Sequence, residues 1–197
     1  MLVPVARPAL AGAASEVVAD FHTALLAIMT AADQLKLNER YQRLAPRVLA
    51  IFNIPFMMQA ATGRQWGDAS EEERAKLVEA FARMSILSYA SRFGTYAGEQ
   101  FEIVGEHQGL NGSYLVRTRF IRPGVGAVPI TYVTKHFGDD WRVVDVIFPG
   151  GVSELALRRS EYLYTLRQGG LASLISRLNQ AADAMLQRAQ STDTSKR

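Results

Sequence analysis

The sequence predicts an α+β domain in which helices before and after a four-stranded antiparallel sheet pack on one face of that sheet. Apolar residues recur at helical spacing up to about Gly94 and again after Ser153, whereas apolar and polar residues alternate in between. Turn sequences of a few residues separate the alternating segments, and connections this short join antiparallel strands. Because neither element can bury its apolar face alone, we expect the helices to close over the sheet as a cup around an apolar cavity.

Helices are predicted in the first half of the chain. From residue 15 onward, apolar residues repeat at helical spacing, namely Val17, Val18, Phe21, Leu25 and Ile28. Residues 38–52 give a second helical segment, which Pro46 is expected to bend or divide. After a loop around Trp66, the S-x-x-E pattern of residues 70–73 predicts a capped helix start, and this helix is expected to run to about Phe93.

Four strands are predicted between Gly98 and Pro149. Their expected bounds are Gln100 to Glu106, Ser113 to Ile121, Pro129 to Phe137 and Trp141 to Phe148. In the second strand Tyr114, Val116, Thr118 and Phe120 share one face, and Arg117 and Arg119 lie on the other. One face of the sheet is therefore expected to meet the core and the other to meet solvent.

The stretch from Asp140 to Arg159 joins the last strand to a helix that must fold back over the sheet. Residues 149–151 are Pro-Gly-Gly, which breaks the strand, and the Ser153 hydroxyl is placed to cap the next helix. That helix is expected to end at Gly169 and Gly170, and a final amphipathic helix follows. We expect the functional site in the space between this strand and this helix.

Composition sets the domain organisation. A chain of 197 residues, 48% of them hydrophobic, is sufficient for one domain with a sizeable core, which we place at residues 15–188. Residues 1–14 are interpreted as a flexible terminus or the remnant of a secretion signal, and residues 189–197 as a disordered tail. The longest apolar run, near residues 24–32, is too short to span a bilayer.

Charge and residue types argue against several functions. A formal charge of +3 with dispersed basic residues does not favour nucleic acid as a partner. The absence of cysteine excludes disulfides and thiolate chemistry. His22, His107 and His136 have no partner at metal-ligand spacing, and the glycines before Ser153 do not complete a nucleophile elbow. We therefore predict no metal site and no cofactor.

Two polar residues in the predicted sheet leave an enzymatic alternative open. Asp145 lies between two valines of the last strand, and Tyr132 lies on the adjacent strand. A buried carboxylate beside a phenol could perform acid/base chemistry, so an isomerase or hydratase in an NTF2-like cup is the alternative function. The other interpretation is a structural aspartate that is satisfied by an arginine or by backbone amides.

One arginine interrupts an apolar helix face. Leu155, Arg159, Tyr162 and Leu166 share a face by their spacing, so the guanidinium of Arg159 needs an anion. Asp145 could supply it as a structural ion pair, and a lipid phosphate or acidic headgroup could supply it instead.

Four segments together give the chain a resemblance to a known family. They are FNIPFMMQAATGRQW, from Phe52; FARMSILSYASRFGTY, within residues 70–96; PITYVTKHFGDDWRVVDV, in the sheet; and GGVSELALRRSEY, followed by a Gly-Gly break and LASLISRL. In this order and spacing they resemble the toluene-tolerance or MlaC family of periplasmic phospholipid-binding proteins. The family commonly has Asn-Tyr-Arg-Ser where this chain has Leu157, Arg158, Arg159 and Ser160, and this form resembles the branch associated with hopanoid biosynthesis.

The resemblance implies a periplasmic lipid carrier and no enzymatic activity. Such a carrier buries the apolar part of a membrane lipid, a phospholipid or a hopanoid-like lipid, between sheet and helices and shuttles it between inner-membrane and outer-membrane complexes. The expected cavity walls are Phe52, Ile54, Met57, Met58, Phe81, Met84, Tyr89, Phe93, Val116, Phe120, Tyr132, Val152, Leu155, Tyr162 and Leu166. Apolar lining is sufficient for this task, because each buried methylene contributes about 0.8 kcal/mol.

Overall fold

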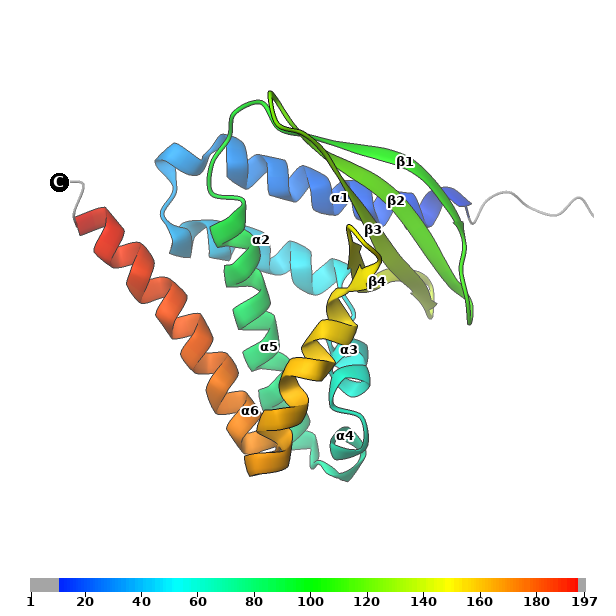
Figure 1. Cartoon of the computed structure of the whole chain (residues 1–197), viewed down its shortest axis with the longest axis vertical. Helices are drawn as coiled ribbons and strands as arrows, with labels where there is room; N and C mark the ends of the chain where they lie inside the picture. Colours follow the sequence, from blue (N-terminus) through cyan, green and yellow to red (C-terminus); the bar gives the residue numbers. More distant parts are fainter. Residues whose placement is uncertain (1–10, 195–197) are drawn as a thin grey trace, which may run out of the picture.

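A computed structural model describes residues 11–194, and it confirms the α+β class with an antiparallel sheet. The helices gather on one face of the sheet, and α1 crosses close beneath it (Figure 1). The strands are β1 (Gln100–Gln108), β2 (Ser113–Arg122), β3 (Gly126–Phe137), β4 (Asp140–Phe148) and β5 (Val152–Ser153), and they neighbour one another in chain order. The alternating burial of β2, with Val116 and Thr118 buried and Arg117 and Arg119 exposed, confirms the predicted inner and outer faces.

The sheet has five strands, so the prediction of four was wrong. Gly150 and Gly151 both have positive φ, 83° and 77°, and this turn returns the chain alongside the end of β4. Val152 then pairs with Phe148, and Ser153 pairs with Ile147, before the helix begins. The sequence pattern missed β5 because two residues are too few to show alternation.

Helix α1 (Ala11–Thr30) forms a wall of the core beneath the sheet and is followed by the short 3₁₀ helix η2 (Ala32–Gln34). Its residues 12–30 are long and apolar enough to cross a membrane, so the expectation drawn from residues 24–32 alone was wrong. Val18, Phe21, Leu25 and Ile28 are nevertheless buried in the domain, as expected for the core helix of a globular domain.

Helices α2 (Leu37–Ile51) and α3 (Ile54–Thr62) meet at a sharp corner below the sheet. Pro46 lies within α2 without dividing it. The corner is fixed by Asn53, whose side chain accepts a 3.0 Å hydrogen bond from the Phe56 N–H and whose own N–H donates to the Val143 carbonyl of β4 at 2.9 Å. The predicted loop around Trp66 contains instead the one-turn helix α4 (Arg64–Asp68).

Helix α5 (Glu71–Arg92) runs through the middle of the helical layer. The predicted capping box is confirmed: the Ser70 hydroxyl accepts from the Glu73 N–H at 3.2 Å, and the Glu73 carboxylate accepts from the Ser70 N–H at 2.9 Å. Leu77, Phe81 and Met84 are among its buried residues, so α5 is the helix around which the others pack.

Helix α6 (Glu154–Thr194) is broken in the middle, as predicted. Gly169 (φ −152°, ψ 19°) and Gly170 (φ 63°, ψ −159°) are not helical, and the two halves form a V beside α5 (Figure 1). The second half continues to Thr194, beyond the predicted start of a disordered tail at residue 189. Residues 11–14 of the predicted N-terminal segment are helical, and the rest of that segment, residues 1–10, lies outside the described residues.

One contiguous cluster of buried apolar side chains joins these elements. It includes residues of α1, α2, α3, α5, both halves of α6 and strands β2 to β4. The hollow among the predicted cavity residues has a volume of about 20 Å³, so the structure does not show the predicted cavity of lipid size there.

Candidate functional site

A small hollow lies where α2, α3, α5 and the start of α6 meet. Its lining residues are Val48, Phe52, Ile54, Met57, Phe81, Ser85, Tyr89 and Glu154. Its volume is about 20 Å³, which is room for about one water molecule. Five of the predicted cavity residues are brought together here, while Val48, Ser85 and Glu154 were missed.

The other predicted cavity residues are buried in the core, partly buried against it or, in one case, exposed. Met58, Met84, Val116, Tyr132, Tyr162 and Leu166 are buried in the surrounding core, and Phe93, Phe120 and Leu155 are partly buried against it. Val152 is the exception, because its side chain on β5 is 47% exposed. The structure therefore places Val152 outside the apolar interior.

A tightly packed aromatic cluster adjoins the hollow on the side of α1 and the sheet. Phe21 is its centre, with ring centroids 5.0 Å from Phe52, 5.2 Å from Tyr89 and 6.1 Å from Tyr132, all edge to face. Such pairs contribute about 0.5–1.5 kcal/mol beyond the burial of their area. Phe21 was recognised as a buried residue of the first helix, but nothing in the sequence placed it beside this site.

His22 is buried in the same cluster as a neutral residue. Its Nε2 is 3.2 Å from the Tyr132 hydroxyl, and its ring stacks on Phe101 at 4.2 Å. Burial lowers the pKa of His22 to about 4, and burial raises the pKa of Tyr132 above its ordinary value. Both groups therefore remain uncharged at neutral pH, and the pair is a hydrogen-bonded part of the core.

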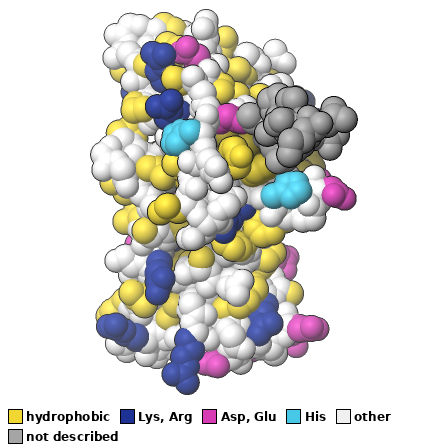
Figure 2. Space-filling model, turned by 90° about the vertical axis from the view of Figure 1, so that its right-hand side faces the viewer, with side chains coloured by type: hydrophobic (Ala, Val, Ile, Leu, Met, Phe, Trp, Pro, Cys, Tyr) yellow, Lys and Arg dark blue, Asp and Glu magenta, His cyan; other side chains and the backbone are white. Residues whose placement is uncertain are grey.

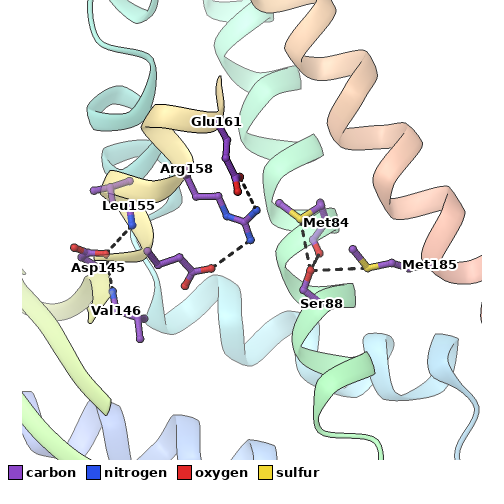
Figure 3. A network of polar contacts seen from close by, with 9 residues as sticks. Met84, Ser88, Asp145, Val146, Leu155, Arg158, Glu161 and Met185 are labelled. Atoms are coloured by element: carbon purple, nitrogen blue, oxygen red, sulfur yellow. Dashed lines mark hydrogen bonds and ion pairs between the residues drawn. The ribbon is translucent and has the colours of Figure 1, made fainter. Parts of the chain in front are cut away.

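A group of polar residues on the first turns of α6 lies next to the hollow: Glu154, Arg158, Glu161 and Tyr162. Figure 3 shows Arg158 extending from α6 toward α5, between the side chains that hold it. Its guanidinium is 3.4 Å from the Glu154 carboxylate and 3.4 Å from the Glu161 carboxylate. Burial raises the pKa of the Glu154 carboxyl, although Arg158 acts in the opposite direction. We call these four residues the α6 polar cluster.

Two atoms of the α6 polar cluster are buried without a hydrogen-bond partner among the described residues. They are Nε of Arg158 and the phenolic oxygen of Tyr162. Tyr162 is 5% exposed, so its hydroxyl is shielded from solvent, and burial raises its pKa. A buried polar group without a partner costs about 1–3 kcal/mol, and this makes the α6 polar cluster the least satisfied part of the interior that we describe.

Asp145 has partners other than the predicted arginine. Its carboxylate accepts hydrogen bonds from the Val146 N–H at 2.8 Å, the Leu155 N–H at 2.9 Å and the Ser153 hydroxyl at 2.5 Å. Ser153 also accepts from the Ala156 N–H at 3.0 Å, which confirms it as a cap of α6. Asp145 is thus a structural residue that ties β4 to the start of α6 (Figure 3).

The predicted pair of Asp145 and Arg159 is not formed. Arg159 is exposed, and no ion pair joins it to Asp145 in the described part of the chain. The arginine that turns inward is its neighbour Arg158, one position earlier on the helix. Leu155, Tyr162 and Leu166 of the predicted face are buried or partly buried, so the error is confined to the arginine, which is at position 158 and not at position 159.

Asp145 and Tyr132 are also kept apart. Tyr132 pairs with Val146, so these two side chains share the inner face of the sheet, and Asp145, the preceding residue, points to the other side. The hydrogen-bond partner of the Tyr132 hydroxyl is His22. The geometry therefore does not provide the carboxylate–phenol pair that the enzymatic alternative requires.

The described surface carries charged side chains of both signs. On the face in Figure 2, Lys and Arg side chains are dispersed among apolar and acidic ones. Within residues 11–194 there is no group of three or more His, Asp or Glu side chains that could hold a metal ion. A hollow of about 250 Å³ lies between α1 and α2, and one of about 430 Å³ lies between α1, the end of α2 and the start of β4; both have charged residues in their lining.

Comparison with known proteins gave two matches and one negative result. The family model described as MlaC protein matches residues 19–180. Among solved structures, a phospholipid-binding protein from Ralstonia solanacearum, determined in complex with a phospholipid, superposes with a TM-score of 0.76 at 17% sequence identity. The match covers 88% of this chain and 98% of that one. No curated protein matches the sequence.

Proposed function

Since this chain belongs to the MlaC family, as the match over residues 19–180 shows, we propose that it is a lipid carrier that holds the acyl part of a membrane lipid beneath α6. The observation that carries the proposal is the hollow at the meeting point of α2, α3, α5 and α6, with its lining of flexible and aromatic apolar side chains. The Ralstonia solanacearum protein, which has the same fold and was determined with a bound phospholipid, supports it.

The hollow must widen before it can hold a lipid. Pockets for drug-sized ligands have volumes of about 300–1,000 Å³, whereas the hollow here has about 20 Å³. The gain from filling it is large, because a chain of about a dozen methylenes contributes about 10 kcal/mol on burial. That gross gain is sufficient to offset the rearrangement of a few side chains and one helix.

The first half of α6 is the element that we expect to move. It covers the hollow through Glu154, it is joined to the sheet through the two-residue strand β5 and the bonds of Asp145, and it ends at the non-helical Gly169 and Gly170. Hinges are a few residues at the ends of elements that absorb a change in φ and ψ. Methionine at position 57 can repack around a guest without strain, because its side chain is unbranched.

The MlaC family is periplasmic, and we place this chain in the periplasm on that ground. There it would receive its lipid from one membrane complex and deliver it to another, with an inner-membrane transporter complex and an outer-membrane complex as the two partners. A phospholipid is the cargo that the relative of known structure supports. A hopanoid-like lipid is the second candidate, because residues 157–160 depart from the common family sequence.

The experiment that tests the proposal is native mass spectrometry of the purified protein, followed by extraction and identification of any bound lipid. We expect one lipid per chain, either co-purified or taken up from vesicles of bacterial phospholipids. A protein that carries no lipid after purification and takes none from vesicles would contradict the proposal. Phe81→Trp distinguishes a lipid in the hollow from a lipid bound at the surface. A bulkier residue in the hollow reduces lipid uptake only if the acyl chain enters the hollow.

A further inference from the structure

The α6 polar cluster has the composition of a headgroup site, and this inference rests on the proposed function. Glu154 belongs both to the lining of the hollow and to the ion pair with Arg158. A lipid whose acyl chain lies in the hollow would therefore leave its polar end within reach of Arg158, one turn further along α6. The question is which headgroup the cluster would accept.

Arg158 is held loosely enough to exchange partners. Both of its carboxylate contacts are 3.4 Å long, whereas charged N–H···O bonds are usually about 2.7–2.9 Å. Its side chain is 22% exposed, so the guanidinium is largely desolvated without a tight partner. An arginine in this situation gains from an acceptor that can approach closely.

The two unsatisfied atoms specify the chemistry of that acceptor. Nε of Arg158 can only donate a hydrogen bond, and the Tyr162 hydroxyl, four residues later on the same helix face, can donate one as well. A phosphate diester offers several acceptor oxygens on one centre and matches the planar fork of a guanidinium. It could satisfy both donors at once.

The flanking glutamates determine the charge of the headgroup. A phosphate bound to Arg158 would displace the Glu161 carboxylate, whose side chain is 47% exposed. Glu161 would then have no cation beside it and would lie next to the negative phosphate. An ammonium group on the same headgroup would restore the balance, whereas a purely anionic headgroup would leave like charges together. A zwitterionic headgroup therefore fits the cluster best.

We propose that the α6 polar cluster recognises the headgroup of a zwitterionic phospholipid, with Arg158 and Tyr162 on the phosphate and Glu161 on the amine. Inorganic phosphate, which has no acyl chain, would bind weakly, because it buries no apolar surface in the hollow.

The test is competition for uptake, measured by native mass spectrometry with mixed vesicles of phosphatidylethanolamine, phosphatidylglycerol and diacylglycerol that carry the same acyl chains. We expect phosphatidylethanolamine to be preferred about tenfold, the effect of one charge-assisted contact. Arg158→Gln should abolish this preference, and Tyr162→Phe should weaken it. The matched control is Arg159→Gln, which alters an exposed arginine on the same turn and should retain the preference.

Each possible outcome supports or overturns a specific part of the proposal. Equal uptake of the three lipids by the unaltered protein, or an unchanged preference in Arg158→Gln, would overturn the headgroup site while leaving the carrier function intact. Uptake of no lipid at all would overturn the carrier function. Thermal protection by inorganic phosphate equal to that by phosphatidylethanolamine would identify a phosphate site instead of a lipid site. If Arg158→Gln fails to fold, Tyr162→Phe decides, because it removes a hydroxyl that has no partner among the described residues.

Discussion

The interior of this molecule has two halves that differ in how closely their side chains pack and in how fully their polar groups are hydrogen-bonded. In the half around Phe21, aromatic rings meet edge to face at 5.0–6.1 Å and the buried histidine has a hydrogen-bond partner. In the half around Glu154 there is an unfilled hollow, the ion pairs of Arg158 are long, and two buried polar atoms have no partner within residues 11–194. The first half has the features of a rigid scaffold. The second has the features of a site that is completed by a guest.

The largest expected effect comes from breaking the rigid half. Phe21→Ala removes the ring at the centre of the aromatic cluster, and we expect it to lower the free energy of unfolding by about 3–5 kcal/mol. Met57→Ala, beside the hollow, should cost about 2 kcal/mol, at the lower end for such a change, because its surroundings are already loose. Urea denaturation measures both. Equal losses would show that the two halves do not differ in packing.

The second effect is a loss of stability in acid that originates in the rigid half. The pKa of His22 is about 4 when folded and about 6.5 when unfolded. As the pH falls, the unfolded chain therefore binds a proton at His22 before the folded chain does. The contribution of neutral His22 to the free energy of unfolding is complete above pH 6.5 and is lost as the pH falls toward 4. The size is on the order of 3 kcal/mol.

Two variants isolate this contribution. His22→Phe should flatten the dependence of unfolding free energy on pH between 4 and 6.5, although it leaves the Tyr132 hydroxyl unpaired at every pH. The control is His107→Gln, which changes an exposed histidine of β1. An unaltered slope in His22→Phe would mean that another group causes the acid sensitivity.

The helix boundaries and the buried face of α1 were largely predictable from sequence, and the candidate site was not. Helical spacing marked Phe21 as buried, the S-x-x-E pattern located the start of α5, and the double glycine marked the break of α6. These are local patterns, and local patterns determine where elements begin and which face is apolar. Helical spacing from Leu155 and Tyr162 fits Arg158 as well as Arg159, and only the contacts of Arg158 with Glu154 and Glu161 in the folded chain distinguish the two.

The size of the interior space could not be predicted from the sequence either. The resemblance implied that Met57, Phe81 and Tyr89 line a cavity, but the same apolar residues can fill a core or line a cavity. The distinction depends on how closely α3, α5 and α6 approach one another. His22 shows the same limit, because its neutral state depends on Phe101 and Tyr132, which are distant in sequence.

The third effect concerns the boundary between the two halves of α6. Gly170 has φ 63° and ψ −159°, a conformation that is essentially restricted to glycine. Gly170→Ala should therefore cost about 1–3 kcal/mol of stability and should also change the rate of lipid uptake, because it strains the proposed hinge. Gly67→Ala, where an added Cβ meets nothing within 4 Å, is the control. Normal uptake by a destabilised Gly170→Ala would remove the hinge from the mechanism.

The smallest effect compares the two kinds of packing on a single helix. Ser85 lines the hollow, whereas Ser88 donates to the Met84 carbonyl at 2.9 Å and lies 3.9 Å from the sulfur of Met185 (Figure 3). Ser85→Val adds apolar volume where there is room, so we expect stability to rise by up to about 0.8 kcal/mol and lipid uptake to fall slightly. Ser88→Val adds the same volume where there is none and should cost about 1–3 kcal/mol. Helix propensity changes equally in both variants, so the difference between their unfolding free energies reports the local packing together with the hydrogen bond that Ser88→Val loses. A difference of zero would mean that the hollow beside Glu154 is no looser than the rest of the core, and the proposed site for the acyl chain would lose its physical basis.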